Sequence, residues 1–222
     1  MFFRRILIGL PILLLCLNAQ ATVYTFSVVE DHLFENPANW YPAFPGTTIA
    51  PFDHWVIEGE MYVSAEVIRV EGNLQIGMQG ALIGTEYHKR IEIALGGIVD
   101  NGGKTLVNQI DLEGNLFNRR SCLFSVEKLL AKPTALTQNY GNLEVEEQFY
   151  NEGRFDNYFS CLVMGDFRNL AVFNQIRKAR LVVAGEIFFQ PGCVLTQSAE
   201  SEIYVGREEK VAIHEQLAAI FK

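Results

Sequence analysis

From Val67 onward, the chain repeats short runs in which apolar and polar residues alternate, broken by glycine and asparagine. One phrase recurs in these runs: apolar, any, apolar, any, glycine, any, apolar. Alternation with a period of two is typical of β-strands with one buried face. The segments that carry the phrase are 67–76, 91–99, 109–117, 142–153, 161–169, 180–188 and 202–206. The pattern therefore predicts an all-β protein.

The glycines of this phrase recur at nearly constant intervals. Intervals of 20 and 21 residues separate Gly165, Gly185 and Gly206, and 18 residues separate Gly96 from Gly114. A repeat of about twenty residues is the signature of a solenoid. Leucine-rich and helical repeats do not fit, because the leucine–asparagine consensus and a 3.6-residue period are both missing.

The interpretation that we favour is a right-handed, single-stranded parallel β-helix of about seven coils. Inward positions carry Ile, Val, Leu and Phe, outward positions carry polar residues, and Gly and Asn stand where the chain turns corners, because they tolerate positive φ. Stacking at about 4.8 Å per coil would give a rod of roughly 33 Å. The alternative is an antiparallel β-sandwich, which also has short alternating strands. A sandwich gives no reason for glycine at a fixed phase.

The coils are predicted to occupy residues 67–213, with one irregularity. The matching phase after Gly114 is Glu146, an interval of 32 residues, so we expect an irregular longer coil at 115–141. Extra length in one coil of a solenoid maps to a loop on one face, often a binding face. The alternative is one degenerate extra half-coil.

Both ends of a β-helix need protection, because unpaired strand edges template aggregation. Residues 22–66, which are rich in proline and aromatic residues, are predicted to form an N-terminal cap and lead-in segment. Residues 214–222 are predicted to form a short C-terminal capping helix, because Leu217, Ile220 and Phe221 fall at helical spacing.

Residues 1–21 have the form of a secretory signal peptide: a basic start, an apolar run at 6–17 and an A-x-A ending at Ala21. The run is too short for a comfortable membrane span. We therefore expect cleavage near Ala21, no membrane span, and an exported protein that is secreted, periplasmic or associated with the cell surface. A lipid anchor at Cys16 is the weaker alternative, because Leu15 stands where a lipobox has a small residue.

The cysteines left after cleavage are Cys122, Cys161 and Cys193. Their number is odd and no C-x-x-C occurs, so buried free thiols are favoured over a disulfide, although one disulfide stays open in an oxidising compartment.

The charge balance of the chain is acidic. The full chain has a formal net charge of −8, and the mature chain keeps 16 basic against 26 acidic residues, or −10. Such a charge argues against nucleic acid and against an anionic membrane surface as partners.

Motifs for catalysis and metal binding are weak. No G-x-S-x-G, phosphate loop, H-x-H or H-x-x-x-H occurs. Asp53 and His54 are neighbours, but adjacent residues on a strand point to opposite faces. Glu86 and His88 would share a face, where an ordinary solvated pair is favoured over a metal or proton-transfer site. We therefore assign no catalytic residue, no metal ligand and no cofactor.

The best functional signal is aromatic. Trp40, Tyr41, Phe44 and Trp55 crowd the N-terminal segment, which holds both tryptophans of the chain. If exposed, these rings could stack on sugars, and they are the candidate binding residues for a glycan or a protein partner. The favoured alternative is that they plug the open end of the core, since burying one such side chain is worth roughly 1.5–3 kcal/mol.

The stretch 34–59, "FENPANWYPAFPG" and then "FDHWVIEG", resembles the N-terminal segment of secreted bacterial β-helix proteins of the adhesin and surface type, common among Bacteroidota-like surface proteins. Their pattern is N-P-x-N-W, P-x-x-P-G and D-x-V-x-I-x-G. The matching positions are Asn36, Pro37, Asn39, Trp40, Pro42, Pro45, Gly46, Asp53, Ile57 and Gly59. The spacer before Asp53 is longer than in that pattern, and Trp55 replaces an aliphatic residue. The resemblance implies an exported parallel β-helix and carries over no catalytic residue.

Together these features predict a secreted, non-enzymatic β-helix protein for surface adhesion or for binding extracellular matrix or glycan. The partners expected are a polysaccharide or a cell-surface protein. One alternative is a polysaccharide lyase or glycoside hydrolase on the same fold, which needs charged side chains from adjacent coils to converge in a groove. A second alternative is a structural subunit that assembles end to end, which needs an uncapped terminus.

Overall fold

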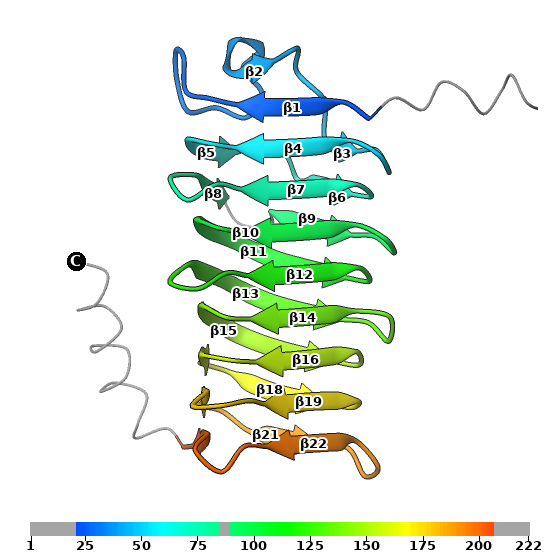
Figure 1. Cartoon of the computed structure of the whole chain (residues 1–222), viewed down its shortest axis with the longest axis vertical. Coiled ribbons are helices and arrows are strands. Elements are labelled where there is room, and N and C mark those ends of the chain that lie inside the picture. Colours follow the sequence, from blue (N-terminus) through cyan, green and yellow to red (C-terminus); the bar gives the residue numbers. More distant parts are fainter. Residues whose placement is uncertain (1–20, 85–88, 207–222) are drawn as a thin grey trace, which may run out of the picture.

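Parallel strands wind into a rod in which each coil stacks on the one before it (Figure 1). The computed structural model describes residues 21–84 and 89–206. The strands of these residues form a 10-stranded and a 13-stranded sheet, and β1 with β2 is the antiparallel exception among their pairs. The predicted parallel β-helix is therefore confirmed, and the antiparallel sandwich is excluded.

Each full coil contributes one strand segment to each of three faces. Face 1, the 10-stranded sheet, contains β1 (Val23–Phe26), β2 (Trp40–Tyr41), β4 (His54–Ile57), β7 (Asn73–Ile76), β10 (Ile98–Asn101), β12 (Asn115–Asn118), β14 (Leu136–Asn139), β16 (Arg154–Asn157), β19 (Val172–Gln175) and β22 (Val194–Gln197). A short 3-10 helix, Pro37–Asn39, precedes β2.

Faces 2 and 3 together make the 13-stranded sheet. Face 2 contains β5 (Glu60–Val63), β8 (Ala81–Gly84), β17 (Ser160–Val163), β20 (Arg180–Val183) and β23 (Glu202–Val205). Face 3 contains β3 (Thr48–Ile49), β6 (Val67–Val70), β9 (Arg90–Ile93), β18 (Asp166–Asn169) and β21 (Ile187–Phe189). Three long strands bend from face 2 into face 3, namely β11 (Lys104–Leu112), β13 (Leu123–Ala131) and β15 (Asn142–Asn151).

The alternation read from the sequence places one apolar column behind each face. On face 1, Trp55 pairs with Leu74, and the same inward column continues to Phe173 and Leu195 in the last coil. Residues that stack on one another in neighbouring coils are 17, 21 or 18 positions apart in the sequence, for example. Because inward residues of neighbouring coils lie directly above one another, like side chains pack on like along the rod.

A buried amide ladder runs along the corner between faces 1 and 2. Asn101 donates to Asn118, Asn118 to Asn139, Asn139 to Asn157 and Asn157 to Gln175, each at 2.8–2.9 Å. Each of these amides also donates to the first backbone carbonyl of the face 2 strand in the next coil, as Asn139 does to the Ser160 carbonyl at 2.7 Å. A buried amide is costly unless it is hydrogen-bonded, and here every rung supplies the partner of the next. The ladder fixes where each turn begins.

The predicted irregular coil at 115–141 is wrong. Asn115 pairs with Leu136 in plain register, and the coil offset there is 21 residues, as in an ordinary coil. The error came from matching Gly114 with Glu146, which lie at different corners of the coil. Gly114 lies between faces 3 and 1, where Ala135 takes the same place in the next coil, whereas Glu146 and Gly165 lie between faces 2 and 3.

The predicted boundary at residue 67 is also too late. β4 already pairs in register with β7, and β5 pairs with β8. The cap is therefore the shorter stretch between β1 and β4, and the rod has eight coils where seven were expected. The boundary was placed too late because Trp55 was assigned to the aromatic cap. Trp55 instead occupies an ordinary inward position of β4, paired with Leu74.

Several predicted features lie outside the described residues. These are residues 1–20 of the predicted signal peptide with Cys16, the Glu86 and His88 pair, and the predicted capping helix at 214–222. Across 21–84 and 89–206, no helix has the length and apolar character needed to cross a membrane.

Candidate functional site

The predicted aromatic site at the N-terminal end is an interior plug. Trp55 is 0% exposed and Trp40 is 5% exposed. Their ring centroids lie 5.2 Å apart, and Phe34 packs against both rings at 5.7 and 5.8 Å. Phe44 packs against Trp40 at 6.3 Å. These rings close the first coil from above and present no open face for stacking a sugar.

Polar contacts hold the plug in place. The Trp40 indole donates to the Phe34 carbonyl at 2.7 Å. The buried side chain of Asn39 accepts from the Val29 amide and donates to the Asp31 and Leu33 carbonyls. A hydrogen bond from the Leu33 amide is the main reason that the pKa of Asp31 is lowered. The prolines and asparagines of this stretch therefore serve to fold a cap.

Tyr41 is the exception among the four predicted binding residues. It is 77% exposed, although it directly follows the buried Trp40 on β2. Neighbouring residues of a strand point to opposite faces, so Tyr41 points outward where Trp40 points inward. A lone exposed tyrosine is ordinary on a protein surface. The sequence thus grouped four aromatic residues that the structure divides between the interior and the surface.

A second group of aromatic residues lies on the surface, at the corner between faces 1 and 2. The turns of this corner come in two lengths. Four-residue turns lie at 77–80, 119–122, 176–179 and 198–201, and two-residue turns lie at 58–59, 102–103, 140–141 and 158–159. In Figure 1 these turns line the left-hand edge of the rod.

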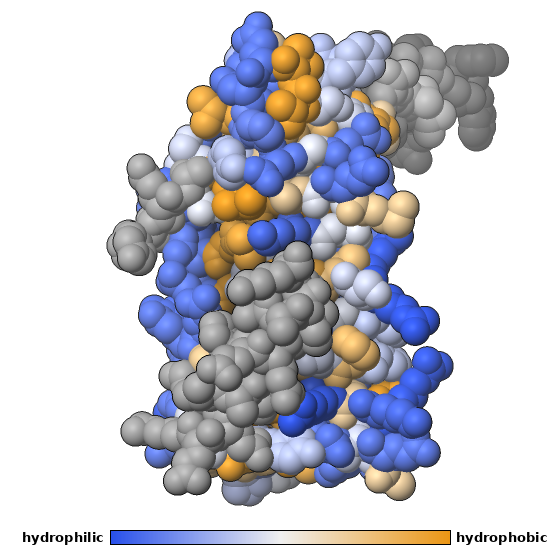
Figure 2. Space-filling model, turned by 90° about the vertical axis from the view of Figure 1, so that its left-hand side faces the viewer, coloured by the Kyte–Doolittle hydropathy of each residue, from blue (hydrophilic) through white to orange (hydrophobic). Residues whose placement is uncertain are grey.

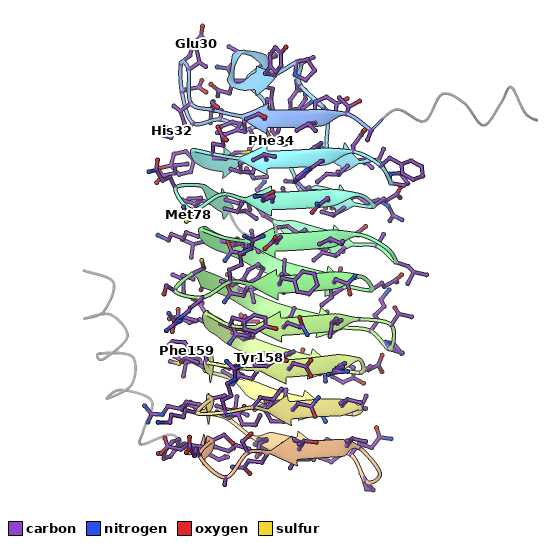
Figure 3. The ribbon with its side chains drawn as sticks, viewed as in Figure 1. Glu30, His32, Phe34, Met78, Tyr158 and Phe159 are labelled. Atoms are coloured by element: carbon purple, nitrogen blue, oxygen red, sulfur yellow. The ribbon has the colours of Figure 1, made fainter. Side chains whose placement is uncertain are left out.

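The two consecutive short turns carry aromatic side chains. Tyr140 and Tyr158 follow the ladder residues of their coils, and their rings stack at 4.3 Å with an interplanar angle of 9°. Burial and a hydrogen bond to Tyr140 raise the pKa of Tyr158, so it stays a neutral phenol. Phe159 is 51% exposed beside it, and Figure 3 shows Phe159 at the same edge as Met78.

The long turns on either side of these aromatic residues are basic. Arg119 and Arg120 occupy one of them, and Arg177 and Lys178 occupy the other. The Arg119 guanidinium bonds to Asp100 through Nε at 2.6 Å and through a second nitrogen, while the Lys178 amine lies 4.0 Å from Glu200. We call the set of residues 119–120, 140, 158–159 and 177–178 the basic-aromatic edge.

Both long turns contain a residue with positive φ that is not glycine. Ser121 has φ 65° and Arg177 has φ 59°. Such a conformation is uncommon for residues other than glycine, and it costs energy unless the surroundings fix it. These two turns therefore hold their basic side chains in a set backbone geometry.

A groove of about 570 Å³ adjoins the basic-aromatic edge. Met78 and Arg120 are among the residues that line it, and Met78 is 92% exposed. Gly80 and Gly103 line its floor, where an added Cβ would collide with carbonyl oxygens of the neighbouring coil. The groove exists because a tight glycine turn lies between two longer turns.

A smaller, charged groove of about 280 Å³ lies at the corner between faces 2 and 3, and it bears on the enzyme hypothesis. Residues from four successive coils line it, among them Glu66, Arg90, Glu127 and Lys128. Each of three has a structural partner: Arg90 bonds to Glu92 at 2.8 Å, Lys128 to Glu147 at 3.1 Å, and Glu127 accepts from Asn108 at 2.7 Å. Such pairs, one within a strand and two between coils, match an ordinary surface network. The lyase or hydrolase hypothesis therefore stays a prediction without a named catalytic residue.

Metal and thiol chemistry find no assembled site in the part of the chain that the structure describes. No three His, Cys, Asp or Glu side chains gather there to hold a metal ion. Cys122, Cys161 and Cys193 are free thiols. Burial strongly raises the pKa of Cys161, which suits an apolar core residue and not a nucleophile.

One sequence signal for the basic-aromatic edge lies outside the predicted aromatic site. An Asn-Tyr pair occurs at 139–140 and again at 157–158, an interval that equals the local coil offset of 18 residues. Two aromatic residues one coil apart lie side by side in a solenoid. The pair could therefore have been placed on one edge before the structure was known.

No protein-family model matches this chain, and neither a curated protein nor a solved structure matches it.

Proposed function

We propose that this chain is an exported, non-enzymatic β-helix protein that binds an anionic polysaccharide of a cell surface or extracellular matrix at the basic-aromatic edge. The observation that carries the proposal is the position of Tyr140, Tyr158 and Phe159 between two basic turns. The predicted signal peptide and the resemblance to surface β-helix proteins support export. Trp40, Phe44 and Trp55 do not serve this role, because they pack in the plug, and Tyr41 is a single exposed ring with no basic turn described beside it.

The geometry suits a linear polymer. Successive coils present the edge at a spacing of about 4.8 Å, so a chain lying along the rod meets a cation, aromatic rings and a cation in turn. Guanidinium groups form strong, paired hydrogen bonds with carboxylate or sulfate groups. An exposed aromatic ring adds apolar contact to the sugar.

Because the chain is acidic overall, a polyanion should bind only where basic side chains gather. The chain as a whole has a formal net charge of −8 and repels a polyanion. Attraction therefore depends on local cations, and it should weaken as salt screens them.

The test is a binding assay with the mature chain on immobilised polygalacturonate and heparin, with neutral dextran as the comparison polymer. Binding to at least one of the two acidic polymers is expected, with dextran left unbound. An Arg120→Ala/Arg177→Ala double variant should bind about tenfold more weakly, since each exposed ion pair is worth roughly 0.2–1 kcal/mol and a tenfold change corresponds to about 1.4 kcal/mol. Phe159→Ala should weaken binding by a smaller factor.

The matched control is Arg69→Ala, which removes one cation from face 3, where Arg69 pairs with Glu71 and Glu92. It should leave the affinity unchanged. Equal losses in this control and in the double variant would show nonspecific charge attraction, and no binding to either acidic polymer would refute the proposal.

A further inference from the structure

The outward residues of face 2 are unusually apolar. One outward column on this face passes through eight coils, and most of its members are aliphatic or aromatic. In chain order the column is Tyr62, Ile83, Leu106, Ser125, Glu144, Leu162, Val182 and Tyr204. Figure 2 looks at this side of the rod and shows apolar surface between the polar residues. An outward position of a secreted β-helix is ordinarily polar, so this column points to a covered surface.

The last coils gather this apolar character into a cluster that is separate from the main core. Leu162 and Val182 form the cluster, and Met164 and Tyr204 pack against them. We call these four residues the lateral patch. Arg180 lies 4.7 Å above the Tyr204 ring, at the margin of the patch. The patch therefore combines aliphatic side chains with one ordered aromatic ring.

We propose that the C-terminal residues of this chain, 207–222, dock on the lateral patch. The segment starts three positions after Tyr204, which itself belongs to the patch. Leu217, Ile220 and Phe221 fall at helical spacing and would form one apolar side. A helix of these 16 residues would be about 24 Å long, ample for the three coils of the patch, which span roughly 10 Å.

The competing location for the segment is the open end of the rod. There, Leu195 is 46% exposed although its register is that of a core residue. The lateral patch is the better site, because it begins next to the segment and needs only that the chain fold back along face 2. Covering Leu195 would need the chain to cross the whole coil from face 2 to face 1.

The test is hydrogen–deuterium exchange of the full mature chain, read by mass spectrometry over residues 211–222. The wild-type segment should exchange about tenfold or more slowly than the same sequence as a free peptide, since docking makes exchange depend on opening. The variant Val182→Glu should lose this protection. Leu195→Glu at the open end and Tyr150→Glu, an outward residue of face 3, should keep it.

Each outcome decides the proposal. Loss of protection in Leu195→Glu but not in Val182→Glu would place the segment on the end of the rod and overturn it. An unprotected wild-type segment would also overturn it. Protection that fades on dilution, together with dimers in sedimentation velocity, would show that the patch binds a second copy. The core peptides 67–84 and 89–150 report in the same experiment whether each variant is folded.

Discussion

The two ends of the rod differ in how well they bury the same inward column of side chains. Trp55 in the first coil and Leu195 in the last stand on one column behind face 1. Trp55 is completely buried under Phe34 and Trp40, whereas Leu195 is nearly half exposed. An inward position in a solenoid is therefore buried only if another layer follows it. The N-terminal end has that layer in its aromatic plug, and the last described coil ends with β21, β22 and β23 at the sheet edges.

The largest effect should come from emptying the plug. Trp55→Ala is expected to cost about 3–5 kcal/mol, because a large buried aromatic side chain leaves a cavity under Phe34 and Trp40. Leu195→Ala should cost about 1 kcal/mol or less, since half of that side chain is already in water. Urea unfolding of both variants measures the difference. Equal losses at the two positions would remove the distinction between a closed and an open end.

Substitutions in the amide ladder should have the next largest effect on stability. The loss should be larger in the middle of the ladder than at its C-terminal end. Asn139 has ladder partners on both sides and also accepts from the Gly141 amide. Asn139→Ala should cost about 2–3 kcal/mol, because it leaves buried polar groups of two coils unpaired.

Gln175→Ala is the matched control at the ladder's C-terminal end. Gln175 accepts from Asn157 and donates to the Glu202 carbonyl at 3.0 Å. The loss should be smaller there, at about 1 kcal/mol, because fewer groups depend on it. Urea midpoints of the two variants test this order, which a larger loss at Gln175 would reverse.

Acid should weaken both the N-terminal plug, through Asp31, and the body of the rod, through Asp156 on β16. The effect of the buried Asp156 should dominate. Burial alone would raise the pKa of Asp156, but hydrogen bonds from Arg154, Asn174 and Gln138 outweigh burial and lower it. A lowered folded-state pKa means that the unfolded chain binds more protons. The stabilisation is therefore present above about pH 4, the value for an unfolded Asp, and is lost as the pH falls below it.

Asp156→Asn should cost about 1–2 kcal/mol at neutral pH and should flatten the fall in stability below pH 4. Asp31→Asn in the plug should have the same sign with a smaller effect, since Asp31 is more exposed. Urea unfolding at a series of pH values gives both slopes. An Asp156→Asn variant with the wild-type slope would show that this carboxylate does not control the acid response.

The smallest effect on stability should come from the exposed edge strand. β22 ends the 10-stranded sheet, and its outward residue Val194 is 54% exposed. Val194→Lys should change the unfolding free energy by less than about 0.5 kcal/mol, as surface substitutions usually do. A lysine on an edge strand opposes pairing with another sheet. Size-exclusion chromatography over a range of concentrations tests the end-to-end hypothesis, which predicts association of the wild type that the variant weakens.

The sequence was sufficient for the repeating architecture, because alternation and glycine spacing both follow from the geometry of a stacked coil. It was not sufficient for the coil count. Ala135 stands at a corner where neighbouring coils have Gly114 and Gly153, so the glycine phase disappears for one coil. A methyl group fits at that corner, and no composition rule shows which corner tolerates it. The hydrogen-bond register reveals the coil directly.

The aromatic residues show the same limit at the level of the site. The prolines and tryptophans of one stretch indicated either a plug of the core or exposed rings that stack on a sugar. The contacts between the Phe34, Trp40 and Trp55 rings show the plug, which was the favoured alternative. The sequence could not place Tyr41 outside and Trp40 inside, since that depends on how β2 pairs with β1. The Tyr140 and Tyr158 pair was readable from its spacing, but the basic turns beside it become neighbours only once the turn lengths are aligned.

The unequal turns at the corner between faces 1 and 2 have a consequence for how such a protein can diversify. Where the amide ladder runs, a buried amide precedes each turn and a face 2 strand follows it, and turns of either two or four residues fit between them. Insertions, deletions and substitutions there would reshape the surface that we propose as a binding site, while the coils below keep their register. If the proposed site is correct, closely related chains with identical interiors are expected to recognise different polymers.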